Sequence, residues 1–254
     1  MSAFANEFWG PPGEEYNSYT LPTGADITHS RYQMGTLMKM RDGRWFRFAG
    51  NDGTAEVVGN VYQMALAVAN HVGLTVQAAA AAAATSIAVT LGATAVTADQ
   101  YKYGYLITED SAGTGFGYVY PVADHASVAS SGVFTVPLLP PYTVQVAVTT
   151  STIASLVLPP WNDVIIHPSP PTRPMVGVAT KVIAANEYGW YQVKGVVAWL
   201  EQGTTVAGDT VIASETVDGA VAPSTATTAS FLGNCLRAVG DGKHGLGWAH
   251  VTGL

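Results

Sequence analysis

Apolar side chains recur at every second position along much of the chain. Residues 86–91, 115–120 and 142–148 each alternate between apolar side chains and small or polar ones. A period of two places successive side chains on opposite faces of an extended chain, which is typical of a half-buried β-strand and not of a helix. The pattern therefore predicts an all-β chain.

An Asp-Gly pair near the N-terminus lies between two stretches with strand character. Residues 38–41 and 44–48 flank Asp42-Gly43. This dipeptide suits a two-residue type I′ turn, because both central residues of that turn need positive φ angles. A β-hairpin with a type I′ turn is therefore predicted.

Two short segments of the chain echo each other. Residues 57–62 read VVGNVY and residues 206–211 read VAGDTV, so each places a glycine and a short polar residue between apolar strands. We predict tight turns at Gly59 and at Gly208-Asp209, and another at Asp218-Gly219. The aspartates of such turns cap backbone N–H groups.

Two segments carry weaker signals. Seven alanines at 78–84 have helical propensity but are too few to form a stable helix alone. We interpret this run as a linker or an extended entry to the next strand. Residues 62–71 fit either a short helix or a strand.

The distribution of charge divides the chain. Asp-Gly pairs lie only outside residues 76–171, and the charged residues inside that stretch are Asp99, Lys102, Glu109, Asp110, Asp124 and Asp163. We predict a β-barrel-like or sandwich-like core domain from 36–75 plus 172–254, with a second β domain inserted at 76–171. The proline cluster at 168–174 would be the return linker.

Residues 1–35 are rich in proline and aromatic residues and lack periodicity. They are predicted to form an extended N-terminal arm. Its aromatic residues need an apolar surface, and either their own domain or a neighbouring subunit would provide one. The candidates for docking between subunits are Phe8, Trp9, Tyr16 and Tyr19.

Composition restricts the class of function. The net charge is −7 without a basic run, which argues against direct binding to nucleic acid. No apolar stretch reaches the roughly 18 residues of a membrane span, and no signal peptide is expected. Cys235 is the single cysteine, so no intrachain disulfide is expected and an origin inside a cell fits best.

Charged residues make up only 11% of the chain, against roughly a quarter in ordinary soluble domains. Such a surface is hard to keep soluble as a free monomer. It favours a surface partly covered by copies of the same chain or by a larger assembly. An ordinary β protein with a Thr/Ser-rich surface is the alternative.

A search for reactive groups yields no catalytic, cofactor-binding or metal-binding assignment. Gly113–Gly117 fits a glycine-rich strand or bulge better than a nucleotide loop. The histidines are dispersed, which gives no local zinc spacing. Asp124-His125 and Ser130-Ser131 resemble parts of a triad, but neighbours on a strand point to opposite faces.

Two further groups have a simpler structural interpretation. The acidic pairs Glu14-Glu15 and Glu109-Asp110 are expected to be solvated charges rather than a glycosidase pair. Aromatic residues on predicted strands either form a sugar-stacking platform or, as expected here, belong to the core or an interface. These aromatic residues are Trp161, Trp190, Tyr191 and Trp199.

The chain resembles a family of virion proteins. Residues 191–254 combine a Gly-led strand, the V-x-G-D turn at 206–209, an Asp-Gly hairpin and an Ala/Thr-rich stretch. Together with 34–53, MGTLMKMRDGRWFRFAGNDG, and with parts of 84–122, they are similar to capsid decoration, or cement, proteins of tailed bacteriophages. Residues 1–35 lie outside this resemblance.

The resemblance implies a structural role without catalytic residues. Proteins of this family bind the outside of the assembled capsid, as trimers or sometimes dimers, and bridge neighbouring major capsid subunits. The expected partners are therefore the major capsid protein and further copies of this chain, on the outer capsid surface of a virion made in the host cytoplasm. The alternatives are a phage tail, fibre or receptor-binding protein, and a carbohydrate-binding or carbohydrate-active β protein.

Overall fold

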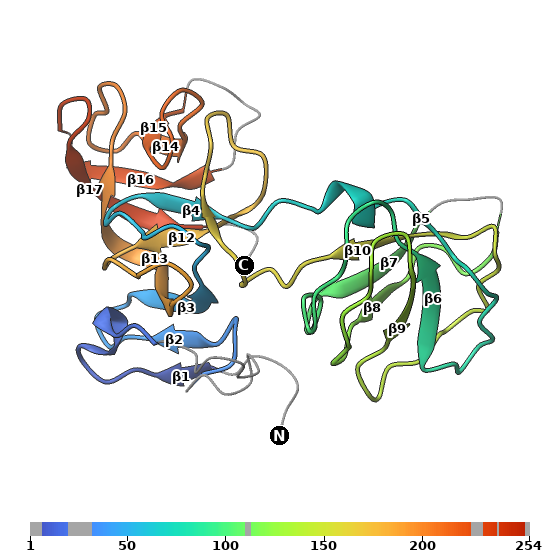
Figure 1. Ribbon diagram of the computed structural model, residues 1–254. Helices are drawn as coiled ribbons and strands as arrows, with labels where there is room; N and C mark the ends of the chain where they lie inside the picture. Colours follow the sequence, from blue (N-terminus) through green and yellow to red (C-terminus); the bar gives the residue numbers. More distant parts are fainter. Residues whose placement is uncertain (1–6, 20–31, 110–112, 225–230, 238, 252–254) are drawn as a thin grey trace. The chain divides into compact units, whose positions relative to one another are not determined.

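The all-β prediction is confirmed by a computed structural model, which describes residues 7–19, 32–109, 113–224, 231–237 and 239–251 (Figure 1). The chain divides into two compact units. The first unit comprises residues 1–65 and 160–254, and the second unit comprises residues 66–159.

One sheet of eleven strands runs through the described part of the first unit. Its main path follows the order β1-β2-β3-β13-β17-β16-β14-β15, and β12, β4 and β11 continue from β13. The bounds are β1 Glu7–Trp9, β2 Leu37–Lys39, β3 Trp45–Gly50, β4 Val61–Gln63, β11 Ile165–Ile166, β12 Met175–Ala179, β13 Tyr188–Leu200, β14 Thr210–Ala213, β15 Val221–Pro223, β16 Phe231–Arg237 and β17 His244–His250. The 3-10 helix η1 spans Glu14–Tyr16.

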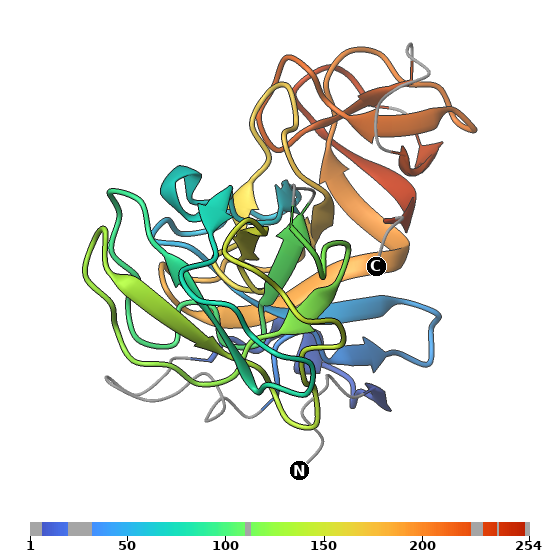
Figure 2. The same ribbon diagram turned by 90° about the vertical axis from the view of Figure 1, so that its right-hand side faces the viewer.

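Strand β13 organises this sheet. It is rich in β-branched and aromatic residues, which favour extended structure. Its first half pairs with β3 and its second half with β17. A register shift after Gln192 and a φ of +93° at Gly195 interrupt its regular geometry, and Figure 2 shows the long orange ribbon changing direction along its length. One strand can therefore join two regions of the sheet.

Three groups of buried side chains stabilise the first unit. Large aromatic residues dominate the first group, which includes Phe48 and Trp190, and the second group combines Tyr62 and Tyr191 with aliphatic side chains. The third group surrounds the fully buried Trp199 with aliphatic side chains of β13, β14, β16 and β17. Burial of this apolar surface provides the main favourable term in folding.

The second unit has strands and a core of its own. Its strands are β5 Leu74–Thr75, β6 Ser86–Thr90, β7 Tyr105–Glu109, β8 Val119–Pro121, β9 Val133–Pro137 and β10 Ile153–Val157, with the 3-10 helix η3 at Ala69–His71. Strands β5, β10, β7 and β8 form one sheet, and β6 pairs with β9. Their inward side chains form a single apolar cluster that includes Ile87, Tyr101 and Phe134.

The strand predictions for this unit are partly wrong. The alternation at 86–91 corresponds to β6, but only the end of 115–120 forms a strand, because Gly115 and Gly117 adopt positive φ angles. Residues 142–148 do not form a strand, and although Val144 and Val148 are buried, Tyr142 and Val146 are exposed. Their backbone bonds instead reach the alanine run, through Val144 to Ala84 and Val148 to Ala80. That run contains no helix among its residues.

The boundaries of the two units differ from those predicted at 75/76 and 171/172. They lie at 65/66 and 159/160. Residues 66–75 belong to the second unit because β5 pairs with β10. Residues 160–171 belong to the first because β11 pairs with β4. Short strands of two residues decide both boundaries, and a composition profile does not detect strands that short.

The described residues of the predicted N-terminal arm belong to the first unit. Strand β1 adds in parallel to β2, and the backbones of Tyr19 and Tyr188 exchange two hydrogen bonds of 2.8 Å. Phe8 stacks on Tyr32 with a centroid distance of 5.1 Å. The prediction of a separate extended arm is therefore wrong for these residues, since β1 and Tyr19 pair with the sheet and Phe8, Tyr19 and Tyr32 pack against its aromatic core.

The predicted echo corresponds to a repeated turn. In 57–60, 206–209 and 217–220 the amide of the fourth residue donates to the carbonyl of the first, at 3.2, 2.9 and 3.3 Å. The third residues, Gly59, Gly208 and Gly219, have φ angles of +84°, +95° and +71°. Positive φ at the third position alone is the signature of a type II turn.

The aspartates at these turns cap backbone donors, as predicted. Asp209 accepts a hydrogen bond of 2.7 Å from the Val206 amide within its own turn. Asp218 accepts one of 2.8 Å from the Ser169 amide and one of 2.7 Å from its hydroxyl. Asp218 therefore also fastens its turn to the proline-rich segment.

The type I′ turn predicted at Asp42-Gly43 is wrong. Only Gly43 has a positive φ, of +89°. The Gly43 amide donates to Met40 at 3.1 Å, and the Met40 amide donates to Arg44 at 2.8 Å. This is the three-residue loop in which a type I turn is followed by a left-handed glycine. The hairpin itself is present, and Asp42 instead accepts a 3.0 Å hydrogen bond from the Arg44 amide.

Candidate functional site

The outer face of the β13–β17 pair carries large apolar side chains. Trp248 is 45% exposed, Val196 40% and Leu246 39%. The strand register places Val196 opposite Trp248 and Ala198 opposite Leu246, and cross-strand partners point to the same side of a sheet. Val196, Ala198, Leu246 and Trp248 therefore form one exposed surface, the β17 patch.

The glycines of β17 explain why its large residues point outward. A Cβ atom on Gly247 would collide with the ring of Trp199, and one on Gly245 with the carboxylate of Glu201. Trp199 and Glu201 are both fully buried. The inner face of β17 is therefore filled by side chains of β13 and of the residue that follows it, and only the outer face accommodates an indole on β17.

A row of alternating indole and ammonium groups crosses the same sheet. The register pairs Trp9 with Lys39, Lys39 with Trp45, Trp45 with Lys194 and Lys194 with His250. The Trp45 ring centroid lies 4.9 Å from Nζ of Lys39 and 4.2 Å from Nζ of Lys194. Both distances are typical of cation–π contacts. This indole–lysine row connects the edge strand β1 with the exposed side of β17.

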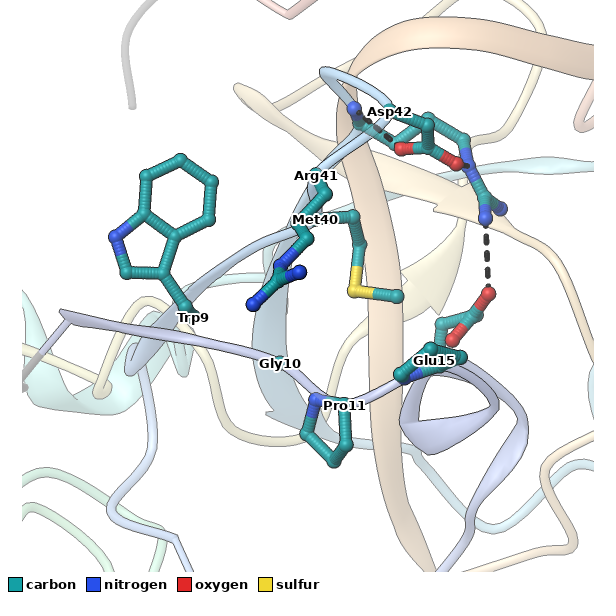
Figure 3. Close-up of a pocket in the computed structure, with 9 residues that line it drawn as sticks. Trp9, Gly10, Pro11, Glu15, Met40, Arg41 and Asp42 are labelled. Carbon is teal, nitrogen blue, oxygen red and sulfur yellow. Dashed lines mark hydrogen bonds and ion pairs between the residues drawn. The ribbon is translucent and has the colours of Figure 1, made fainter.

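A pocket opens beside the edge strand, where Trp9 is 68% exposed (Figure 3). Its volume is about 590 Å³, which lies in the range of ligand sites. Its apolar wall consists of Trp9, Pro11, Pro12 and Met40, and its polar wall consists of Glu15, Arg41, Asp42 and Arg44. We call it the Trp9–Arg41 pocket. Gly10 allows the chain to cross close to Met38 and Met40, because a Cβ atom there would overlap both side chains.

Three charged groups of this pocket form a network. The Arg44 guanidinium lies 2.9 Å from Glu15 and 2.7 Å from Asp42. Partial burial acts to raise the pKa of Asp42, but hydrogen bonds from the Arg44 amide and guanidinium outweigh it and leave that pKa below its usual value. The charge of Arg44 is therefore balanced within the protein.

The structure separates the four residues predicted to dock between subunits. Phe8 and Tyr19 pack against the aromatic core of the first unit. Trp9 and Tyr16 remain exposed. Surface contacts with a partner are thus available to Trp9 and Tyr16, whereas Phe8 and Tyr19 already contact their own unit.

Sequence reasoning missed the residues of the β17 patch and Arg41. In HGLGWAH, strict alternation suggests that Leu246 and Trp248 face the core, because they are the apolar members. The signal that could have found their outward position is the pair of glycines at the alternate sites. Arg41 lies in a turn beside an Asp-Gly pair, and no sequence motif marks it as a functional residue.

Burial of the side chains decides between the two interpretations of the aromatic residues, a sugar-stacking platform or a place in the core or an interface. Trp190, Tyr191 and Trp199 are buried in the core, as expected, and do not form a sugar-stacking platform. Trp161 is half-buried, with the guanidinium of Arg47 5.2 Å from its ring centre.

The candidate triad residues do not pair. Asp124 forms an ion pair of 2.9 Å with the buried Lys102. The ring of His125 accepts a 3.0 Å hydrogen bond from the Tyr101 amide. Asp124 and His125 therefore engage different partners.

The expectation of solvated charges at Glu14-Glu15 is wrong. Both residues are buried, and Glu14 accepts a hydrogen bond of 3.0 Å from Asn17 while Glu15 binds Arg44. In the described residues, no group of three or more His, Cys, Asp or Glu is arranged to hold a metal ion. Nor does the described part of the chain contain a helix that is long and apolar enough to span a membrane.

No family model, curated protein or solved structure matches this chain.

Proposed function

We propose that this chain is a structural component of a tailed-phage particle that binds the outside of the assembled capsid and bridges neighbouring major capsid subunits. The β17 patch is the observation that carries the proposal. Large exposed apolar patches mark interaction surfaces, and behind this one the buried Trp199 and Glu201 fill the space beneath the glycines of β17, so that Leu246 and Trp248 point outward.

The sparse charge of the chain supports the same role. Charged residues make up 11%, and exclusion of charge from the centre of an interface is the compositional signal of protein–protein contacts. A second contact, between copies of this chain as a trimer or dimer, would cover a further part of the surface.

The proposed mechanism is stabilisation by mass action. A protein that binds the assembled lattice and not the dissociated subunit shifts the equilibrium toward the assembled state. Because one capsid presents many equivalent sites, modest contacts at each site sum over the particle. The β17 patch would supply the apolar centre of each contact, and the cations Lys39 and Lys194 of the indole–lysine row would lie at its border.

The decisive experiment measures the position and copy number of this chain in intact particles. Quantitative mass spectrometry and cryo-electron microscopy should find it on the capsid exterior, in a fixed ratio to the major capsid protein. A few copies confined to the tail would contradict the proposal and favour the tail or receptor-binding alternative.

A variant tests the surface itself. Trp248→Glu should weaken binding to capsids that lack this chain by roughly tenfold or more, because it places a charge at the centre of an apolar contact. Val182→Glu is the matched control, since Val182 is also an exposed apolar residue of the first unit. Equal binding by both variants would show that the β17 patch is not the contact surface.

A further inference from the structure

The Trp9–Arg41 pocket contains a cation without a partner among the residues that the structure describes. Arg44 in the same pocket is held by Glu15 and Asp42. Arg41 forms neither a hydrogen bond nor an ion pair with any described residue, and its side chain is exposed. Figure 3 shows it directed into the space between Trp9 and Met40. A guanidinium in this position is available to bind a carboxylate through two parallel hydrogen bonds.

The remaining surface around Arg41 is apolar. The exposed indole of Trp9 forms one side, and Pro11, Pro12 and Met40 complete the wall. An indole at the surface offers a large contact area with few rotatable bonds, which is why tryptophan and arginine recur at the energetic centres of interfaces. A ligand with both a carboxylate and an apolar group would satisfy both walls.

The positions of the two side chains suit an extended peptide. Trp9 lies on the edge strand β1 and Arg41 lies in the turn that follows β2, and both side chains line the pocket. In an extended peptide, side chains at i and i+2 point to the same side, roughly 7 Å apart. A peptide along this edge can therefore place an apolar side chain on Trp9 and an acidic side chain on Arg41.

We propose that the Trp9–Arg41 pocket binds an extended acidic segment of a partner protein, with a carboxylate on Arg41 and an apolar side chain, two residues away, on Trp9. Charge complementarity selects this occupant, because Arg41 is the cation of the pocket that has no counterion among the described residues. A sugar fits less well, since sugars need several polar partners and Arg44, Glu15 and Asp42 already bind one another. The proposal is independent of capsid binding through the β17 patch.

The test uses the full-length protein and defined peptides. The probe is a fluorescein-labelled eight-residue peptide with leucine and aspartate alternating at every second position and serine between them. A matched peptide carries asparagine in place of aspartate, and a glucuronate-containing oligosaccharide serves as an anionic sugar. Fluorescence anisotropy gives the affinity for each peptide, and displacement of the labelled peptide reports binding of the sugar.

Binding should depend on both walls of the pocket. Arg41→Glu and Trp9→Ala should each weaken binding of the aspartate peptide by roughly tenfold or more. The asparagine peptide should bind the unmodified protein about as weakly as the aspartate peptide binds these two variants. Arg237→Glu is the control for charge, because Arg237 is an exposed arginine on β16 outside the pocket, and it should retain full affinity. Circular dichroism should show that all three variants are folded.

Three results would overturn the proposal. They are no measurable binding of the aspartate peptide to the unmodified protein, equal binding by Arg41→Glu, and displacement by the oligosaccharide at concentrations below those needed for unlabelled aspartate peptide. None of these results bears on the copy number of the chain in particles, so failure here is distinguishable from failure of the proposed function.

Discussion

At the scale of single residues, Glu56 is a carboxyl group that is buried in the folded protein without compensating hydrogen bonds from the described residues. Neither of its oxygens has a hydrogen-bond partner among the described residues. Loss of solvation, reinforced by the nearby charge of Asp52, raises its pKa to about 9 from an ordinary value of 4.5. The folded protein therefore holds Glu56 protonated at neutral pH, whereas the unfolded chain ionises it.

The sign of the resulting pH dependence follows from linkage. Between about pH 4.5 and pH 9 the folded state binds a proton at Glu56 that the unfolded state has released. The contribution of this group to stability is therefore complete below pH 4.5 and declines as pH rises toward 9. Other ionisable groups add their own pH dependence to the stability of the protein. The contribution of Glu56 is therefore isolated only by comparison with a variant that lacks its carboxyl group.

Glu56→Gln should remove that dependence, because the amide does not ionise. We expect the melting temperature of the variant, relative to the unmodified protein, to increase between pH 5 and pH 8.5 in thermal unfolding experiments. Glu215→Gln is the control, since Glu215 is exposed, and its difference from the unmodified protein should stay constant. A constant difference for Glu56→Gln as well would show that Glu56 is ionised in the folded state.

At the scale of secondary structure, β17 reverses the usual arrangement of a strand on a core. Its small residues Gly245, Gly247 and Ala249 face inward, and Leu246 and Trp248 face outward. The cause lies in β13, whose Trp199 occupies the space under the glycines. Two tryptophans on adjacent strands thus have opposite roles, one in the core and one on the surface.

This difference predicts unequal effects on stability. Trp199→Ala should lower the free energy of unfolding by roughly 3–5 kcal/mol, the usual cost of removing a buried aromatic side chain. Trp248→Ser should change it by no more than about 1 kcal/mol, since nearly half of the Trp248 side chain is already exposed. Urea denaturation followed by far-ultraviolet circular dichroism measures both. A comparable loss for the two variants would contradict the assignment of Trp248 to the surface.

At the scale of the whole molecule, the chain consists of two units with separate cores. The second unit encloses its own apolar cluster, with Tyr101 bound to the buried His71 through a hydrogen bond of 2.6 Å. The first unit is assembled from residues on both sides of it in the sequence. A unit with a complete core can in principle fold without the rest of the chain.

Residues 66–159 should therefore fold as an isolated fragment. We expect dispersed amide resonances in a two-dimensional ¹H–¹⁵N spectrum and a cooperative thermal transition. The fragment 76–171, which follows the boundaries suggested by composition, lacks His71 and β5 and should melt at a lower temperature. An isolated 66–159 fragment without dispersed resonances would show that its core depends on the first unit.

Glycine-containing segments of the sequence predicted the positions of the tight turns. Val-x-Gly segments at 57–59, 206–208 and 217–219 form the same type II turn, because glycine alone adopts its positive φ without strain. The type I′ turn at Asp42-Gly43 was the exception. Loop length there is set by pairing between Met40 and Arg44, which the dipeptide does not specify.

The candidate site was less accessible to sequence reasoning. Trp9 was identified because it lies in an aromatic, proline-rich segment, but its neighbour Phe8 was given the same role and is instead packed on Tyr32. Arg41 and the β17 patch were not identified. Their significance depends on which charges are already paired and which face of a strand is already occupied.

The sequence by itself determined that the chain is all-β and where its glycine turns lie, because strand periodicity and positive φ angles are properties of neighbouring residues. Only the tertiary structure decided which side chains reach the surface. Trp199 and Trp248 both lie within strands, and their local sequence does not distinguish them. Contacts between the strands bury Trp199 and leave Trp248 exposed. Likewise, Arg44 is neutralised because Glu15, 29 residues away in the sequence, packs beside it, whereas Arg41 has no counterion in the described part of the chain.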